Sequence, residues 1–177
     1  FFIFFFSQKI YADVKVEIIK NLENTKTLKF NFTQSTNGKE EIGKCIMLFP
    51  GSLKCTYQDD KLKELVIRKD KLIITQKRYN KTYMYPVSGS LFLKILDKKE
   101  LIKIIKTSSL KTNTNLIKLF YQINESENIT VLFNKNNYDL MGWITQDRFN
   151  NEVVFLIEVY SKNEKISEKE FKPYTIN

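Results

Sequence analysis

The stretch that decides the fold is Leu28–Tyr57, LKFNFTQSTNGKEEIGKCIMLFPGSLKCTY. It opens with apolar residues that alternate with polar ones, which is typical of a β-strand buried on one face. The pair Asn37-Gly38 then gives a strong signal for a two-residue hairpin turn. Two more apolar runs follow, on either side of a corner at Pro50-Gly51. The stretch therefore predicts three antiparallel strands, over residues 28–33, 42–49 and 53–57.

Outward from this stretch, most apolar runs have the period of strands, and two segments have the period of helices. Val16, Ile19 and Leu22 predict a short amphipathic helix that begins at an Asp13 cap. Residues 90–106 predict two helices with a boundary at Asp97. Further strands are expected at 62–68, 72–76, 82–85, 116–123, 129–133, 139–145 and 153–160, and around Phe171. The pattern favours a large curved antiparallel sheet of about ten strands with a helical plug.

The length of 177 residues predicts one domain. Residues 1–12, FFIFFFSQKIYA, resemble the second half of a secretory signal peptide that is cleaved after Ala12. A buried strand or an uncleaved membrane anchor is the alternative for this segment. We expect residues 1–12 to be a signal peptide remnant and 13–177 the domain, which would then work in an oxidising compartment.

The charge of the chain is basic, with 29 Lys and Arg against 20 Asp and Glu. The basic residues are spread along the sequence without a run of five or six. This distribution predicts a solvated, lysine-rich surface, with attraction to anionic lipid or to an acidic partner as the alternative. A nucleic acid is not expected as a partner outside the cytoplasm.

The residue types of the commonest catalytic sites are missing. The chain contains no histidine, which removes the most frequent general base and zinc ligand. It also has no Gly-rich phosphate loop and no G-x-S-x-G motif. Asp59-Asp60 lies between two strand-like runs and is expected to form a turn. We therefore predict no enzyme activity, no catalytic residues, no metal and no cofactor.

Cys45 and Cys55 are the two cysteines of the chain. Two thiols without histidine leave a zinc shell half empty, and C-x₂-C redox spacing is absent. A two-residue turn at Pro50-Gly51 would place them on opposite faces, whereas a three-residue loop or a bulge would place them opposite each other. We expect a disulfide and an irregular turn at Gly51, with two reduced, separately buried cysteines as the alternative.

Several segments resemble, in their order, motifs of one protein family. They are FNFTQ (30–34), Gly43 followed by PGSLKCTY (50–57), YPVS (85–88) before the helical segment, LMGWITQD (140–147) and FKP (171–173). The chain resembles the periplasmic outer-membrane lipoprotein carrier family (LolA) over nearly all of residues 13–177.

The resemblance implies a mainly β protein with helices (α+β). Its curved antiparallel sheet would form an incomplete β-barrel, covered by an N-terminal helix and an inserted helical lid. It also implies a monomeric periplasmic chaperone without enzymatic activity that binds lipoprotein acyl chains. Such a carrier receives lipoproteins from an inner-membrane lipoprotein-releasing ABC transporter and passes them to an outer-membrane lipoprotein receptor.

An apolar cavity under the lid is the expected binding site. We expect its lining to include Phe32, Met47, Leu53, Ile74, Phe92, Leu96 and Trp143. Periodicity does not decide between such a cavity and an ordinary core. The alternatives are therefore a lipid-binding or sensor domain of the envelope on the same scaffold, and a non-carrier interaction domain with a filled core.

The chain departs from the family at Phe49, which stands where the family has an arginine that bonds to the lid. That latch cannot be carried over to this sequence. Because the residue before a proline favours extended geometry, and because Leu48 and Leu53 are apolar neighbours, we expect Phe49 to contact the lid. The alternative is an exposed apolar contact for a membrane or a partner.

Overall fold

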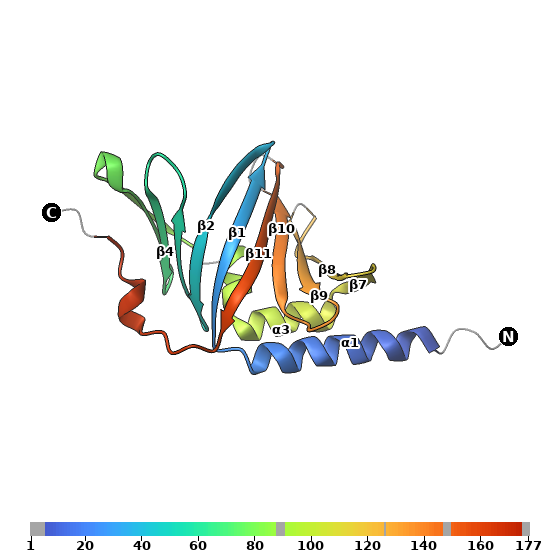
Figure 1. Cartoon of the computed structure of the whole chain (residues 1–177). Coiled ribbons are helices and arrows are strands. Elements are labelled where there is room, and N and C mark those ends of the chain that lie inside the picture. The colour runs from blue at the N-terminus through green and yellow to red at the C-terminus, as the bar shows by residue number, and fades with distance from the viewer. Residues whose placement is uncertain (1–5, 88–90, 126, 147–149, 175–177) are drawn as a thin grey trace.

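The computed structural model describes residues 6–87, 91–125, 127–146 and 150–174, and for residues 6–12, 91 and 92 it describes the backbone alone. Its strands belong to a single antiparallel sheet with the order β6-β5-β4-β3-β2-β1-β11-β10-β9-β8-β7 (Figure 1). The strands are β1 (Thr27–Thr36), β2 (Lys39–Leu48), β3 (Ser52–Tyr57), β4 (Lys63–Arg68), β5 (Lys71–Gln76), β6 (Lys81–Pro86), β7 (Ser109–Thr112), β8 (Leu116–Gln122), β9 (Asn128–Asn134), β10 (Leu140–Gln146) and β11 (Glu152–Lys162). The helices are α1 (Phe6–Glu23), α2 (Leu91–Leu96) and α3 (Lys98–Thr107), with the 3₁₀ turns η1 (Lys77–Tyr79) and η2 (Glu168–Phe171).

The sheet curves around α3, and α1 lies along its lower end (Figure 1). Because β1 pairs with both β2 and β11, the two halves of the chain meet at the centre of the sheet. In the part of the chain that the structure describes, β6 and β7 remain unpaired on their outer sides. The predicted incomplete barrel with an N-terminal helix and an inserted helical segment is therefore confirmed.

The concave face of the sheet carries the main core. Leu28, Phe30 and Phe32 of β1 point to this face and are buried. Their partners on β2 are Met47, Cys45 and Gly43, in that order. This alternation is the sequence pattern that predicted the strand, because successive side chains of a strand point to opposite faces.

Gly43 lets the centre of the sheet close tightly. A Cβ at this position would lie 2.2 Å from the Thr56 carbonyl oxygen and 2.7 Å from the Phe32 ring. Glycine is therefore required for the Phe32 ring to lie over β2.

The chain after β11 covers part of the convex face. This segment, residues 163–174, contacts β3 and β4 through η2, and Phe171 in η2 is fully buried. The end of this segment is held by the buried Glu64 carboxylate of β4, which accepts a hydrogen bond from the Tyr174 backbone N–H at 3.0 Å. The same carboxylate pairs with Lys77 at 2.8 Å and with Lys54 at 3.5 Å.

Two predictions of local structure were wrong, and one strand was not predicted. The first helix begins at Phe6 and runs through Asp13 rather than starting there. Phe171 lies in a 3₁₀ turn and not in a strand, since its buried ring packs from a turn whose start is capped by Ser167. The edge strand β7 was not expected, because its residues are mostly exposed and its sequence lacks the apolar alternation of a strand. No helix among the described residues is long and apolar enough to cross a membrane.

Candidate functional site

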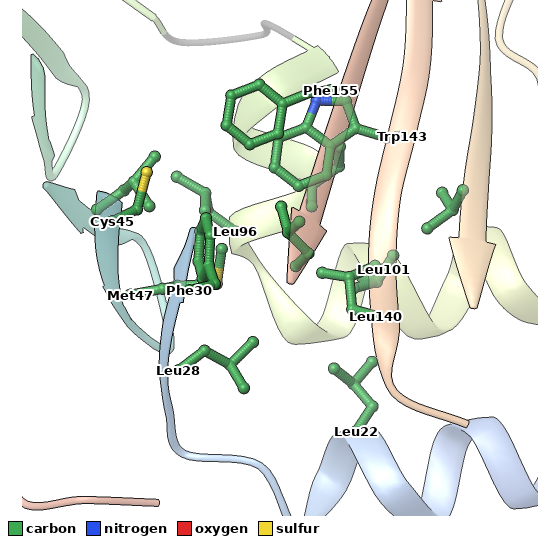
Figure 2. Packing of buried hydrophobic residues seen from close by; sticks show 14 of the residues in the cluster. Leu22, Leu28, Phe30, Cys45, Met47, Leu96, Leu101, Leu140, Trp143 and Phe155 are labelled. Atoms are coloured by element: carbon green, nitrogen blue, oxygen red, sulfur yellow. The ribbon is translucent and has the colours of Figure 1, made fainter. Parts of the chain in front are cut away.

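Most residues of the predicted binding site meet on the concave face. Phe32, Met47, Leu53, Leu96 and Trp143 are all buried in one hydrophobic cluster. Figure 2 shows the side chains of Met47, Leu96 and Trp143 gathered in this cluster. Ile74 lies outside the cluster, on β5, and is half-buried. The side chain of Phe92 lies outside the described residues, although its backbone belongs to α2.

The helical segment α2–α3, called the lid from here on, fills the concave face. Leu96 at the end of α2 is fully buried, as are Leu101 and Ile105 of α3. Asp97 separates the two helices and caps α3, since its carboxylate accepts hydrogen bonds from the N–H groups of Lys99 and Glu100. The side chains of Leu96, Leu101 and Ile105 lie buried against the concave face, where we expected the cavity to be.

A row of stacked aromatic rings crosses the concave face next to the lid. The Trp143 and Phe155 rings stack at 4.5 Å between centroids, and Phe155 and Phe32 stack at 5.0 Å. Tyr57 meets the other side of Phe32 edge-on at 4.9 Å. Sequence reasoning did not single out Phe155. The period-two alternation of the run 153–160 places it on the same face as Ile157 and could have identified it.

An open cleft of about 650 Å³ adjoins this row at the end of the sheet away from α1. Its apolar wall comes from β5 and β6, with Ile74, Tyr83 and Tyr85. Its charged wall comes from β2 and from the β3–β4 turn, and includes Glu41, Asp59 and Lys63 among others. Of the predicted site residues whose side chains are described, Ile74 alone lines this cleft. The cleft is thus amphipathic, and it was not predicted from the sequence.

Lys63 and Tyr57 lie side by side on the charged side of the cleft. The Lys63 ammonium group lies 2.6 Å from the Glu41 carboxylate and 3.6 Å from the centroid of the Tyr57 ring. The Tyr57 hydroxyl donates a hydrogen bond of 3.4 Å to the Gln34 side-chain oxygen. Burial raises the pKa of the Tyr57 phenol, and the negative charges of Glu41 and Asp59 raise it further.

The raised pKa of Tyr57 predicts a loss of stability at alkaline pH. Above about pH 10 the unfolded chain releases this proton, whereas the folded chain retains it, so the unfolded state becomes favoured. The contribution is fully present below the unfolded pKa of tyrosine and is lost as the pH rises toward the folded pKa. Denaturant unfolding over a pH series should therefore give a steeper alkaline decline for the wild type than for Tyr57→Phe. Equal slopes would contradict the prediction.

The corner between β2 and β3 joins the sheet to the lid. The Gly51 N–H donates a hydrogen bond of 3.0 Å to the Leu96 carbonyl, and the Phe49 N–H donates one of 3.0 Å to the Lys26 carbonyl. Phe49 is only 8% exposed. The Lys98 ammonium group, in the first turn of α3, lies 5.4 Å from the centroid of the Phe49 ring and donates to the Glu23 carbonyl at the end of α1.

The Phe49 ring also faces a small hollow between α1 and the sheet. The lining of this hollow includes Leu22 of α1, Leu28 of β1 and Leu140 of β10. The corner is therefore packed between α1, the lid and the sheet. The Phe49 ring is thus buried at the corner, in contact with the interior of the structure.

Cys45 and Cys55 are joined by a disulfide in the structure, with an S–S distance of 2.02 Å. They are paired directly across β2 and β3, and Leu48 and Ser52 close the ladder around a loop of three residues. Gly51 in this loop has a φ of +84°, a conformation that favours glycine.

The disulfide leads to a prediction for the protein in solution. Thiol counting on the unfolded, unreduced chain should find no free thiol. The double variant Cys45→Ala/Cys55→Ala should lower the free energy of unfolding by about 3 kcal/mol, the chain-entropy value for a loop of about ten residues. Two reactive thiols per chain would show that the bond does not form.

Comparison with known proteins identifies relatives of this architecture. A family model described as outer membrane lipoprotein carrier protein LolA matches residues 23–174. A comparison with curated proteins finds no significant match.

Solved structures with the same fold come from several bacteria. An uncharacterized conserved protein from Thermus thermophilus aligns with a TM-score of 0.55 and 10% identity over 93% of each chain. The lipoprotein LppX from Mycobacterium tuberculosis aligns with a TM-score of 0.52 and 10% identity over 91% of this chain and 99% of that one. A DUF1329 family protein from Desulfovibrio piger aligns with a TM-score of 0.51 and 7% identity over 93% and 96%. At these identities the likeness concerns the fold alone.

Proposed function

The chain belongs to the LolA family of outer membrane lipoprotein carrier proteins, and on this premise we propose that it binds lipoprotein acyl chains and carries them between the membranes. The proposal places it in the periplasm. It would receive lipoproteins from an inner-membrane lipoprotein-releasing ABC transporter and pass them to an outer-membrane receptor. It would act as a monomer, without catalysis and without a cofactor. Cleavage of residues 1–12 belongs to the same proposal and is tested by sequencing the N-terminus of the mature protein.

The observation that carries the proposal is a concave apolar face covered by helices instead of a second sheet. The lid contributes Leu96, Leu101 and Ile105 to this face and takes no part in the strand ladder. It can therefore move away without any strand losing a partner. An acyl chain that enters would contact the same side chains of the sheet.

Exchange of the lid for an acyl chain would make binding reversible. An acyl chain of about fifteen methylenes exposes apolar surface worth about 12 kcal/mol in water, at roughly 0.8 kcal/mol per methylene. Opening the lid exposes its own apolar side chains to water, which costs free energy. The affinity is the difference between these two terms. A carrier needs such a difference, because its cargo has to leave again.

Trp143 allows a direct test, because it is the single tryptophan of the chain and is buried on the concave face. A brominated fatty acid that enters under the lid should quench Trp143 fluorescence on contact, whereas an unbrominated one should not quench it. Trp143→Phe should lose the signal and keep the binding, measured by equilibrium dialysis. Absence of quenching, together with absence of acyl lipid in mass spectra of the purified protein, would refute the proposal.

The burial of Leu96, Leu101 and Ile105 against the sheet favours one alternative, an interaction domain of the envelope with a permanent core. In that case the lid would never open, and Trp143 would not be quenched at any concentration of the probe. The same titration therefore distinguishes the two functions.

A further inference from the structure

The edge strand β6 is the most exposed strand of the sheet. All six residues from Lys81 to Pro86 are exposed, including Tyr83 at 41%, Met84 at 59% and Tyr85 at 47%. No strand among the described residues pairs with its outer side. Natural proteins usually protect such an edge, because its free N–H and C=O groups can pair with another chain.

The hydrogen-bond pattern identifies the free groups. The Val87 N–H donates to the Asp70 carbonyl at 2.9 Å, and Lys71 pairs with Pro86 in the same register. Because bonded and non-bonded pairs alternate in an antiparallel ladder, Tyr85 and Tyr83 bond to β5. The N–H and C=O groups of Thr82 and Met84 therefore point away from the sheet. Pro86, which has no N–H, occupies an outward position where the ladder does not need one.

The free edge is continuous with the amphipathic cleft. Tyr83 and Tyr85 stand on β6 and form part of the cleft wall, so a strand added along β6 lies directly beside the cleft. Tyr57 belongs both to the aromatic row of the concave face and to the cleft, so an acyl chain that lies along this row would reach the cleft. The polypeptide attached to it would then meet an unpaired strand at the exit.

The charge around the edge indicates the kind of peptide. Between residues 69 and 86, all of them described, four exposed cations stand against the single exposed anion Asp70. The cations are Lys69, Lys71, Arg78 and Lys81. Two copies of this chain paired through β6 would bring both sets of cations together, which costs free energy. An acidic or uncharged segment in extended conformation suits the edge better.

We infer that β6 binds the polypeptide of the cargo lipoprotein as an added strand, next to the cleft through which its acyl chains leave. The inference rests on the proposed acyl-binding function and adds a second, peptide-specific contact to it. Backbone hydrogen bonds to Thr82 and Met84 supply the affinity, as in other cases of strand addition. The cations around the edge favour acidic side chains in the added strand.

The test compares brominated palmitate with an N-terminally acylated peptide carrying the same brominated chain on ten residues of Ser, Thr and Asp. Both are titrated by Trp143 quenching. The wild type should bind the acyl-peptide at least tenfold more tightly than the fatty acid. Met84→Pro removes one outward N–H, a change that an edge strand tolerates, and should abolish this gain. Met84→Ala keeps the N–H and should retain it.

Two further measurements make the result independent of how well Met84→Pro folds. An acyl-peptide with N-methyl groups on alternate residues, made in both registers, should lose the gain on wild-type protein in one register. Replacing its Asp residues by Lys should weaken binding. Equal affinity of the wild type for fatty acid and acyl-peptide would overturn the inference and leave the proposed function standing. A fatty acid that does not quench would refute the proposed function instead. Sedimentation of the free protein as a dimer that Met84→Pro dissociates would assign the edge to a second copy and overturn the inference.

Discussion

Replacement of Leu96 by glutamate is expected to drive the lid off the sheet. Leu96 is fully buried in the cluster under the lid, and a carboxylate there would be a buried charge without a partner, which costs several kcal/mol. The burial of the leucine side chain, which is worth roughly 1.5–3 kcal/mol, is lost as well. The chain can avoid most of the cost by moving the lid into water, because the sheet does not depend on the lid for its ladder.

Three measurements check this result. Far-UV circular dichroism should keep its strand signal, while trypsin cleavage after Lys98, Lys99 or Lys103 should become much faster. An acyl probe should still quench Trp143, but it should dissociate at least tenfold faster, because the lid no longer covers it. Leu96→Met conserves volume and should change little, and Thr107→Glu places the same charge on the exposed side of the lid. A variant that unfolds entirely would show that the lid is an inseparable part of the core.

The sequence predicted those parts of the fold whose pattern is local. The alternation at Leu28, Phe30 and Phe32 identified β1 and its buried face, and Asp97 marked the division of the lid into two helices. The sequence pattern did not predict the local structure at positions where tertiary contacts determine it. Phe171 was expected in a closing strand because FKP (171–173) resembles a family motif, but Ser167 and Glu170 cap a 3₁₀ turn that carries it onto the convex face. Among the described residues β7 pairs with β8 alone, and most of its side chains are exposed.

In the candidate site, too, local patterns predicted some features and tertiary contacts determine the others. Alternation placed Phe32, Met47, Leu53 and Trp143 on one face, but it could not tell whether that face lines a cavity or a core. The answer depends on how deeply α2 and α3 enter the curve of the sheet, which no local pattern encodes. The cleft at the other end depends on Lys63 and Glu41, which lie 22 residues apart and come together only through the register of β2, β3 and β4. Tyr83 and Tyr85 join it for the same reason, through their pairing with β5.

Replacement of Phe49 by serine is expected to speed ligand exchange. The ring is buried between α1, the lid and the sheet, and removal of such a ring from water is worth roughly 1.5–3 kcal/mol. If this burial holds the lid closed, its loss lowers the free energy of opening by a similar amount. Exchange would then become roughly tenfold to a hundredfold faster. The main-chain bond from Gly51 to Leu96 remains possible in the variant, so the corner keeps its backbone and loses only the ring.

The salt dependence of ligand exchange distinguishes an apolar contact at Phe49 from a charged one. Exchange in the wild type should depend little on salt, because burial of a ring is not screened, whereas Phe49→Arg should make exchange salt-dependent through its exposed charge. Stopped-flow recovery of Trp143 fluorescence, after mixing loaded protein with an excess of lipid vesicles, measures both rates. Phe49→Leu retains most of the burial and should exchange at nearly the wild-type rate. If Phe49→Ser exchanged no faster than Phe49→Leu but bound vesicles more weakly, the ring would act as a membrane contact, and the lid would be held by Leu96 and α3 alone.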